Sequence, residues 1–97
     1  MHLKKYTMIK NNQTVKLVYS DWSTNSNKEY NVNLIEKPDN RYIVKCTYGR
    51  RYRANNSTLK TDYPVTHNEA VKIFNRVVTQ KIGKGYEIID QLLVLYA

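Results

Sequence analysis

The sequence is poor in the residues that make cross-links, metal sites and membrane spans. Cys46 is the single cysteine among 97 residues, so no disulfide within the chain and no cysteine-based metal site are expected. No stretch approaches the roughly 18 consecutive apolar residues of a membrane helix. Residues 1–5 lack the apolar segment of a secretory signal. We therefore expect a soluble, cytoplasmic protein with no membrane partner, in which Cys46 is a small buried apolar side chain.

The side-chain groupings of an enzyme are also missing. The eight acidic residues are scattered, and neither a His–Cys nor a Ser–His grouping occurs at a suggestive spacing. The chain has three glycines, and no glycine-rich phosphate loop follows a predicted strand. We expect no catalytic activity and no cofactor.

Negative charge is absent from the middle of the chain. Between residues 41 and 60 there are six basic residues and no acidic one, and the whole chain has a net charge of +8. Such an excess indicates an acidic partner, either nucleic acid, an anionic membrane or an acidic protein. Lysine and asparagine are both abundant, as in proteins of AT-rich genomes, so the arginines are the better evidence. Positive charge is concentrated in this window.

Alternating apolar residues predict a series of short strands. Two β-type runs, 3–9 and 15–22, flank the turn-forming residues 11–13 and predict an N-terminal hairpin over 3–22. Trp22 is interpreted as an anchor of the core of this hairpin.

Two further runs, 30–35 and 42–48, predict adjacent antiparallel strands joined by the turn residues 38–40. We expect a basic loop over residues 50–56 and a returning strand over residues 57–62.

One helix is predicted to begin at Thr66. Thr66 and Glu69 have the spacing of a capping box. The apolar stripe that would pack on a sheet consists of Ala70, Phe74, Val77 and Val78. Gly83 and Gly85 are expected to end the helix, and the apolar C-terminal segment 87–97 to form a final strand or packed segment. The prediction is one α+β domain over 1–97, a small antiparallel β-sheet meander with one main α-helix packed across it.

Four pieces of the sequence, in this order, resemble the WGR domain family, which is named for its Trp-Gly-Arg triplet. The pieces are Tyr30–Glu36, Tyr42–Arg50, Glu69–Phe74 and Lys81–Tyr86, and the resemblance covers about residues 18–86. It implies a small antiparallel sheet with a helix packed across it. In DNA-dependent poly(ADP-ribose) polymerases the domain contacts a DNA strand end and relays that contact to neighbouring domains, and bacterial versions occur alone or fused to other modules.

The chain departs from the family pattern at the triplet itself. Tyr48 stands where the family has tryptophan, and Arg51 and Tyr52 follow in place of the usual small apolar residue and glycine. The smaller ring reduces the area for stacking, whereas the added positive charge favours contact with phosphate.

The expected nucleic-acid site is centred on this run. Its arginines are expected to hold phosphates, and Tyr48 or Tyr52 to stack on an unpaired or terminal base. The candidate residues are Lys45, Tyr48, Gly49, Arg50, Arg51, Tyr52, Arg53, Lys81 and Lys84.

Each assignment has a structural alternative. The arginines could form a solvated loop, and Arg50 could pair with Glu69 or Glu36. Tyr48 could lie in the core, because it is in register with the apolar residues of its strand. Lys81 and Lys84 could simply complement the helix dipole.

We therefore expect a module that binds nucleic acid without base-sequence specificity. DNA ends or single-strand junctions are the expected ligands, and RNA is left open. The alternative is a protein-interaction adaptor that docks a separate acidic partner.

Overall fold

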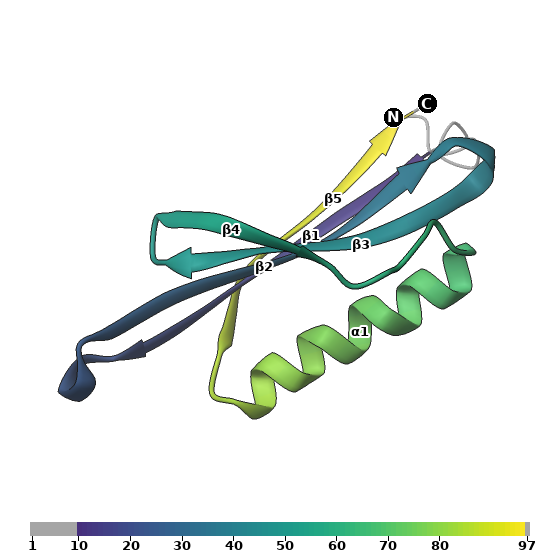
Figure 1. Cartoon of the computed structure of the whole chain (residues 1–97). Helices are drawn as coiled ribbons and strands as arrows, with labels where there is room; N and C mark the ends of the chain where they lie inside the picture. Colours follow the sequence, from purple (N-terminus) through teal and green to yellow (C-terminus); the bar gives the residue numbers. More distant parts are fainter. Residues whose placement is uncertain (1–9, 97) are drawn as a thin grey trace.

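The computed structural model is a single antiparallel sheet with one long helix packed across one face (Figure 1). The structure describes residues 10–96, and the side chains of residues 12–91. The elements are β1 (Lys10–Asp21), the 3-10 turn η2 (Trp22–Thr24), β2 (Ser26–Lys37), the 3-10 turn η3 (Pro38–Asn40), β3 (Arg41–Arg50), β4 (Arg53–Leu59), α1 (His67–Gly83) and β5 (Glu87–Tyr96). The predicted α+β class is confirmed. Among the residues that the structure describes, none of the helices combines the length and the apolar character of a membrane span.

The sheet has the strand order β4-β3-β2-β1-β5, with every pair antiparallel. Strands β1 to β4 form the predicted meander. After α1 the chain reaches the edge of the sheet opposite β4, where β5 pairs with the free edge of β1. The predicted final strand is therefore confirmed for residues 87–96, and β1 is bonded on both sides.

The core lies between α1 and the sheet face that it covers. Because side chains alternate along a strand, one set of positions on each of β1, β2 and β3 faces the helix. The buried residues of this set are Val15, Leu17, Tyr30, Val32, Leu34, Tyr42, Val44 and Cys46. Ala70, Phe74 and Val77 are buried from the helix side, and Val78 is partly buried against them, as the stripe predicts. Cys46 is a buried free thiol, as expected.

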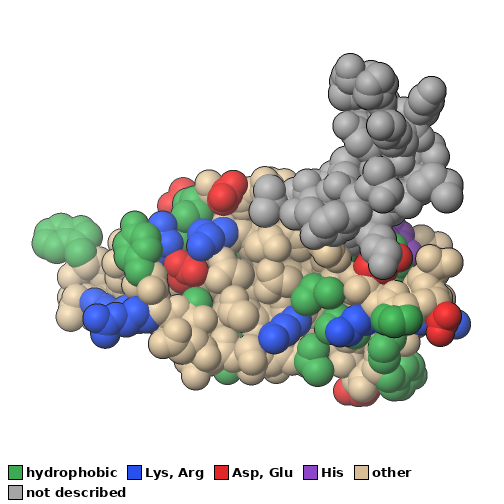
Figure 2. All heavy atoms as spheres, turned by 90° about the horizontal axis from the view of Figure 1, so that it is seen from above, with side chains coloured by type: hydrophobic (Ala, Val, Ile, Leu, Met, Phe, Trp, Pro, Cys, Tyr) green, Lys and Arg blue, Asp and Glu red, His purple; other side chains and the backbone are tan. Residues whose placement is uncertain are grey.

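The opposite face of the sheet is mostly polar. Figure 2 views the molecule from this side, where most of the visible surface is tan, the colour of other side chains and backbone, with scattered charged and hydrophobic groups. This is the usual consequence of alternation in an antiparallel sheet with one covered face.

Both ends of α1 agree with the sequence. The Thr66 hydroxyl accepts a hydrogen bond from the Glu69 amide at 3.2 Å and donates one to the Glu69 carboxylate at 3.1 Å. The helix ends at Gly83, and Gly85 follows with φ +99. A Cβ atom at residue 85 would lie 3.1 Å from the Tyr19 ring, so glycine suits both the conformation and the space.

The predicted N-terminal hairpin over 3–22 is wrong where it can be examined. Residues 11–13, the predicted turn, lie inside the continuous strand β1. The ladder to β5 pairs all three residues, and the ladder to β2 begins at Gln13, which lies opposite both Leu34 and Leu93. This pairing holds the stretch extended despite its turn-forming residues. Run 3–9 lies outside the described residues. Trp22 is not a core anchor, because it is 92% exposed at the tip of the β1–β2 connection.

The predicted basic loop over residues 50–56 is also wrong. The chain turns sharply at Arg51 and Tyr52, where Tyr52 has φ 68, and β4 already begins at Arg53. Strand β4 therefore ends at Leu59, earlier than the predicted strand over 57–62. The turn is this tight because Gly49 has no side chain: a Cβ there would lie 2.5 Å from the Arg53 carbonyl oxygen.

Candidate nucleic-acid interface

An open groove of about 700 Å³ lies on the helix-facing side of the sheet, beside the last turn of α1. It is lined by Asn25, Ser26, Asn27, Lys28, Glu29, Tyr30, Tyr48, Gly49, Arg50, Thr58, Lys60, Lys81 and Tyr86. A smaller pocket of about 380 Å³ shares four of these residues and adds Tyr19 and Lys84. We call the two together the basic groove.

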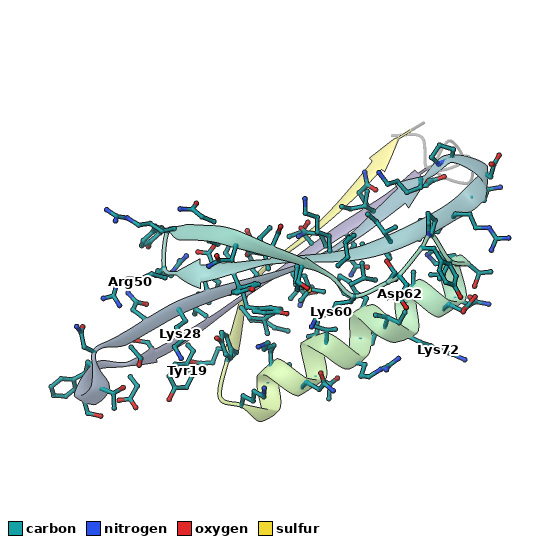
Figure 3. The ribbon with its side chains drawn as sticks, viewed as in Figure 1. Tyr19, Lys28, Arg50, Lys60, Asp62 and Lys72 are labelled. Atoms are coloured by element: carbon teal, nitrogen blue, oxygen red, sulfur yellow. The ribbon has the colours of Figure 1, made fainter. Side chains whose placement is uncertain are left out.

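Five cations line the basic groove: Lys28, Arg50, Lys60, Lys81 and Lys84. They come from β2, β3, the β4–α1 connection and the end of α1, and the fold alone brings them together. Lys28 and Arg50 are direct partners in the β2–β3 ladder, so the two side chains lie on the same face. Figure 3 shows Tyr19, Lys28 and Lys60 on the side of the sheet that faces α1, with Arg50 at the end of β3.

Tyrosine rings form the floor between these cations. The rings of Tyr30 and Tyr48 are stacked, with centroids 5.7 Å apart and an interplanar angle of 19°. Tyr86 packs edge-on against Tyr30 at 6.3 Å and contacts Tyr19 at 5.6 Å. Four aromatic side chains therefore form one continuous cluster within the groove.

The Lys81 ammonium lies directly over this cluster. Its Nζ is 4.1 Å from the Tyr30 ring centroid and 5.3 Å from that of Tyr86, both within cation–π range. Burial lowers the pKa of Lys81, and the charges of Lys84 and Lys60 lower it further. Burial raises the pKa of both Tyr30 and Tyr86, so the rings stay neutral. The groove therefore holds a concentration of positive charge that an anion would relieve.

Tyr48 has features of both roles considered for it. One side of its ring packs on the buried Tyr30, while the residue as a whole is 37% exposed and lines the groove. It is the outermost residue of the core stripe on β3, so it lies at the boundary between core and groove.

Adjacent arginines at the β3–β4 turn have opposite environments. Arg50 is exposed and donates from Nη1 to the Asn25 carbonyl oxygen at 3.4 Å. Arg51 instead donates from Nη1 to Glu29 Oε1 at 2.7 Å, and its side chain is only 18% exposed. The Arg51 guanidinium also lies 4.1 Å from the Tyr52 ring centroid. The alternative considered for Arg50, a pairing with Glu69 or Glu36, is not found among the described ion pairs.

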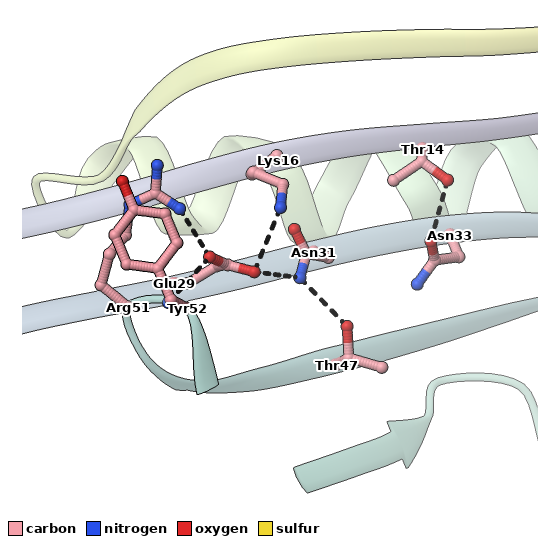
Figure 4. Close-up of polar contacts among 8 residues, drawn as sticks. All are labelled: Thr14, Lys16, Glu29, Asn31, Asn33, Thr47, Arg51 and Tyr52. Atoms are coloured by element: carbon pink, nitrogen blue, oxygen red, sulfur yellow. Dashed lines mark hydrogen bonds and ion pairs between the residues drawn. The ribbon is translucent and has the colours of Figure 1, made fainter. Parts of the chain in front are cut away.

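Glu29 is the centre of a polar network on the open face of the sheet (Figure 4). Its carboxylate accepts hydrogen bonds from Asn31 at 2.9 Å and Lys16 at 3.2 Å besides that from Arg51. Burial would raise the pKa of Glu29, but these donors outweigh it and lower the pKa to about 2. Glu29 is the acidic residue among those that line the groove. Its negative charge is balanced by Lys16 and Arg51 on the face of the sheet opposite α1.

Of the nine candidate residues, the structure brings five together in the basic groove: Tyr48, Gly49, Arg50, Lys81 and Lys84. The other four lie elsewhere. Lys45 is exposed on the opposite face, where it follows the buried Val44 in alternation. Arg51 is bound to Glu29, and Tyr52 is 82% exposed at the turn. Arg53 is exposed at the start of β4 and does not line the groove.

Sequence reasoning missed the groove residues Tyr19, Lys28, Tyr30, Lys60 and Tyr86 as site candidates. Extending the predicted pairing of runs 30–35 and 42–48 by two residues would have placed Lys28 opposite Arg50. Tyr86 belongs to a piece that carried the resemblance. Lys60 is the last basic residue of the window without acidic residues, but nothing local placed it at the site, because its position depends on the path of the β4–α1 connection.

Comparison with known proteins supports the family resemblance. No curated protein and no solved structure matches the chain. The family model of the WGR domain matches residues 13–91, five residues more at each end than the range 18–86. The matched range includes the whole lining of the basic groove. Nucleic-acid binding is the role ascribed to this family. Because the match covers most of the chain and the fold agrees with it, the protein belongs to the WGR domain family.

Proposed function

We propose that this WGR domain binds nucleic acid in the basic groove, at DNA ends or single-strand junctions and without base-sequence specificity. The observation that carries the proposal is the combination of five cations and four tyrosine rings in one open groove. The family assignment favours the same class of ligand.

Phosphate contact is the first part of the proposed mechanism. Lys28 and Arg50 approach the groove from the sheet, and Lys81 and Lys84 from the end of the helix. A sugar-phosphate chain between them would receive charge from both sides. Such contacts release counterions and give affinity that does not depend on sequence.

Ring stacking is the second part. The exposed part of Tyr48 is backed by Tyr30, so its orientation is fixed before a ligand arrives. Every base has a face that can stack on such a ring, but only an unpaired or terminal base leaves that face free. This is why ends and junctions are the preferred ligands in the proposal.

The proposed role is that of a binding module and not of an enzyme. Glu29, the carboxylate among the lining residues, accepts three side-chain hydrogen bonds and has a pKa of about 2. A carboxylate held in this way is a poor general base.

A titration with a matched control tests the proposal. The double variant Lys28→Ala/Arg50→Ala removes two groove cations, and Lys72→Ala/Arg76→Ala removes the same charge from exposed positions of α1 outside the groove. Fluorescence anisotropy would be measured with labelled single-stranded, nicked and blunt DNA and with matched RNA, at several salt concentrations. We expect the groove variant to lose affinity for every sequence and to reduce the salt slope by roughly 0.7 to 0.9 per lost contact. The control variant should change both much less.

Equal effects of the two variants would contradict the proposal, because charge alone would then explain binding. If the wild type binds every structure with only the weak affinity of non-specific contact, about 10⁻⁴ to 10⁻⁶ M, the protein-adaptor alternative is favoured. Comparison of the DNA and RNA titrations decides between the two nucleic acids.

A further inference from the structure

A hairpin arm, residues 19–26, projects from the sheet at the basic groove. Pairing of β1 with β5 ends at Val18 and Glu87, and the β2–β3 ladder ends at Lys28 and Arg50, with one further bond from the Arg51 amide to the Asn27 carbonyl. The β1–β2 ladder alone continues, as far as Asp21 and Ser26. Figure 1 shows this connection, in dark blue, extending beyond the other strands.

Trp22 is at the tip of the hairpin arm and is 92% exposed. The turn at the tip is nevertheless closed by hydrogen bonds of its own. The Asp21 carboxylate accepts from the Ser23 amide at 3.2 Å and from the Ser23 hydroxyl at 2.6 Å. The Asn25 amide donates to the Trp22 carbonyl at 3.2 Å, with Asn25 in the left-handed conformation. The indole is thus presented to solvent from a formed turn, which reduces the entropy cost of binding.

The surroundings of Trp22 suit a nucleobase better than a protein partner. Its neighbours in the turn, Ser23 and Thr24, are polar and exposed, so the turn itself adds no apolar side chain next to the ring. Protein hot spots are usually packed within an apolar patch, whereas stacking on a base needs one flat ring and a nearby cation. Arg50 provides that cation, because its guanidinium bonds to Asn25 at the base of the turn.

The hairpin arm is also continuous with the basic groove. Asn25 and Ser26 line the groove, and Tyr19 at the base of the arm lines its smaller pocket. Trp22 stands six positions before Lys28. At about 3.3 Å per extended residue, Trp22 therefore lies at most about 20 Å from Lys28, and it is closer to Asn25 at the near end of the groove. A single strand of roughly six stacked nucleotides, at about 3.4 Å each, would span that distance.

We propose that Trp22 is a second stacking site, for an unpaired base of a single strand whose phosphates lie in the basic groove. This inference rests on the proposed function and adds a site to it. It makes the domain a reader of single-stranded extensions, with one end of the strand at the tyrosine cluster and the other at the arm.

Trp22 is the only tryptophan in the chain, so its fluorescence reports the contact directly. Wild-type protein would be titrated with blunt duplex and with duplexes that carry overhangs of increasing length. We expect quenching to appear as the overhang lengthens and to be present by roughly six nucleotides, with little change for blunt duplex. Trp22→Ala should weaken binding of the long overhang about 5- to 150-fold and leave blunt duplex unchanged. Trp22→Phe should fall between the two, and both variants should fold because the side chain is exposed.

The outcomes separate this inference from the proposed function. If the overhang binds, Trp22 fluorescence stays constant and Trp22→Ala binds equally well, the second stacking site is excluded while the groove is retained. If wild-type protein binds none of the DNAs beyond non-specific levels, the proposed function itself fails. A change in Trp22 emission that follows protein concentration without DNA would mean that the ring packs against a second copy, which would overturn the inference.

Discussion

At the scale of single residues, neighbours in the sequence have separate tasks. Arg50 and Arg51 have the same chemistry, yet one is exposed at the groove and the other is held by a buried carboxylate on the opposite face. A dense arginine run therefore contains one candidate ligand contact and one structural ion pair. Composition alone cannot distinguish them, because the difference comes from the pleat and from the turn at Tyr52.

Arg50→Ala and Arg51→Ala should consequently affect different properties, the first nucleic-acid binding and the second stability. Arg50→Ala is expected to weaken nucleic-acid binding and lower the salt slope by roughly 0.7 to 0.9, with little change in the free energy of unfolding. Arg51→Ala leaves Glu29 without its shortest ion pair and should lower the free energy of unfolding by about 2 to 3 kcal/mol. Denaturant unfolding and anisotropy titrations on both proteins check this. The same loss of stability in both would show that Arg50 is also structural.

Glu29 should make the stability of the protein fall in acid. Its pKa is about 2 in the folded state against 4.5 when unperturbed, so the unfolded state binds a proton first as the pH falls. The stabilisation is complete above about pH 4.5 and is lost progressively towards pH 2. The shift corresponds to an order of 3 kcal/mol. Urea unfolding across this range measures it.

Glu29→Gln is the control for that acid dependence. It should be less stable at neutral pH, because Lys16 and Arg51 lose their counter-ion, and should show a weaker dependence between pH 4.5 and 2. An unchanged acid dependence in this variant would assign the effect to other carboxylates.

At the scale of elements, the sequence predicted what depends on local pattern. Alternation identified the cores of β2 and β3, and the capping box with its apolar stripe identified α1. Local pattern gave the wrong conformation for residues 11–13, predicted as a turn, and for residues 50–56, predicted as a loop. In both segments the conformation is decided by pairing with other strands. In β1 a second partner, β5, is far away in the sequence, so no local rule could show that the asparagines there would be extended.

Much of the candidate site was outside the reach of local rules for the same reason. Tyr48, Gly49 and Arg50 could be found because they form a motif. Lys28 becomes their neighbour through strand register, and Lys60 through the path of a connection. A site assembled from several separate parts of the chain can be located only after these parts have been placed in space.

The β3–β4 hairpin should depend on Gly49. Gly49→Ala places a methyl group 2.5 Å from a backbone oxygen, which cannot move aside without opening the turn. We expect a loss of about 1 to 3 kcal/mol in the free energy of unfolding. Gly83→Ala is the matched control, since a Cβ there meets nothing within 4 Å, and it should be neutral or slightly stabilising. Equal stabilities in thermal unfolding would contradict this account of the turn.

At the scale of the whole molecule, the fold is completed by a strand that is distant in sequence. Strand β5 pairs with β1 from Lys10 to Val18 and converts an edge strand into an inner one. The sheet is then covered by α1 on one face and polar on the other. An unpaired β1 would leave a long row of free backbone donors and acceptors.

Removal of residues 87–97 should therefore cause association of the truncated protein. We expect dimers or larger species by light scattering and a lower midpoint of thermal unfolding, because the edge of β1 is exposed. Addition of a synthetic peptide of residues 87–97 should restore the monomer by strand addition. A truncated protein that remains monomeric and as stable as the full chain would show that β5 contributes little.

The two walls of the basic groove differ in stiffness. The wall formed by the last turn of α1 is fixed by the core, whereas the hairpin arm is tied to the described residues around it mainly by the Tyr19–Tyr86 contact and the Arg50 hydrogen bond to Asn25. An arm with so few ties bends at low energetic cost while its tip keeps its own shape. The groove can thus adjust its width, and, if it binds nucleic acid as proposed, the same small domain accommodates both a thin single strand and the thicker end of a duplex.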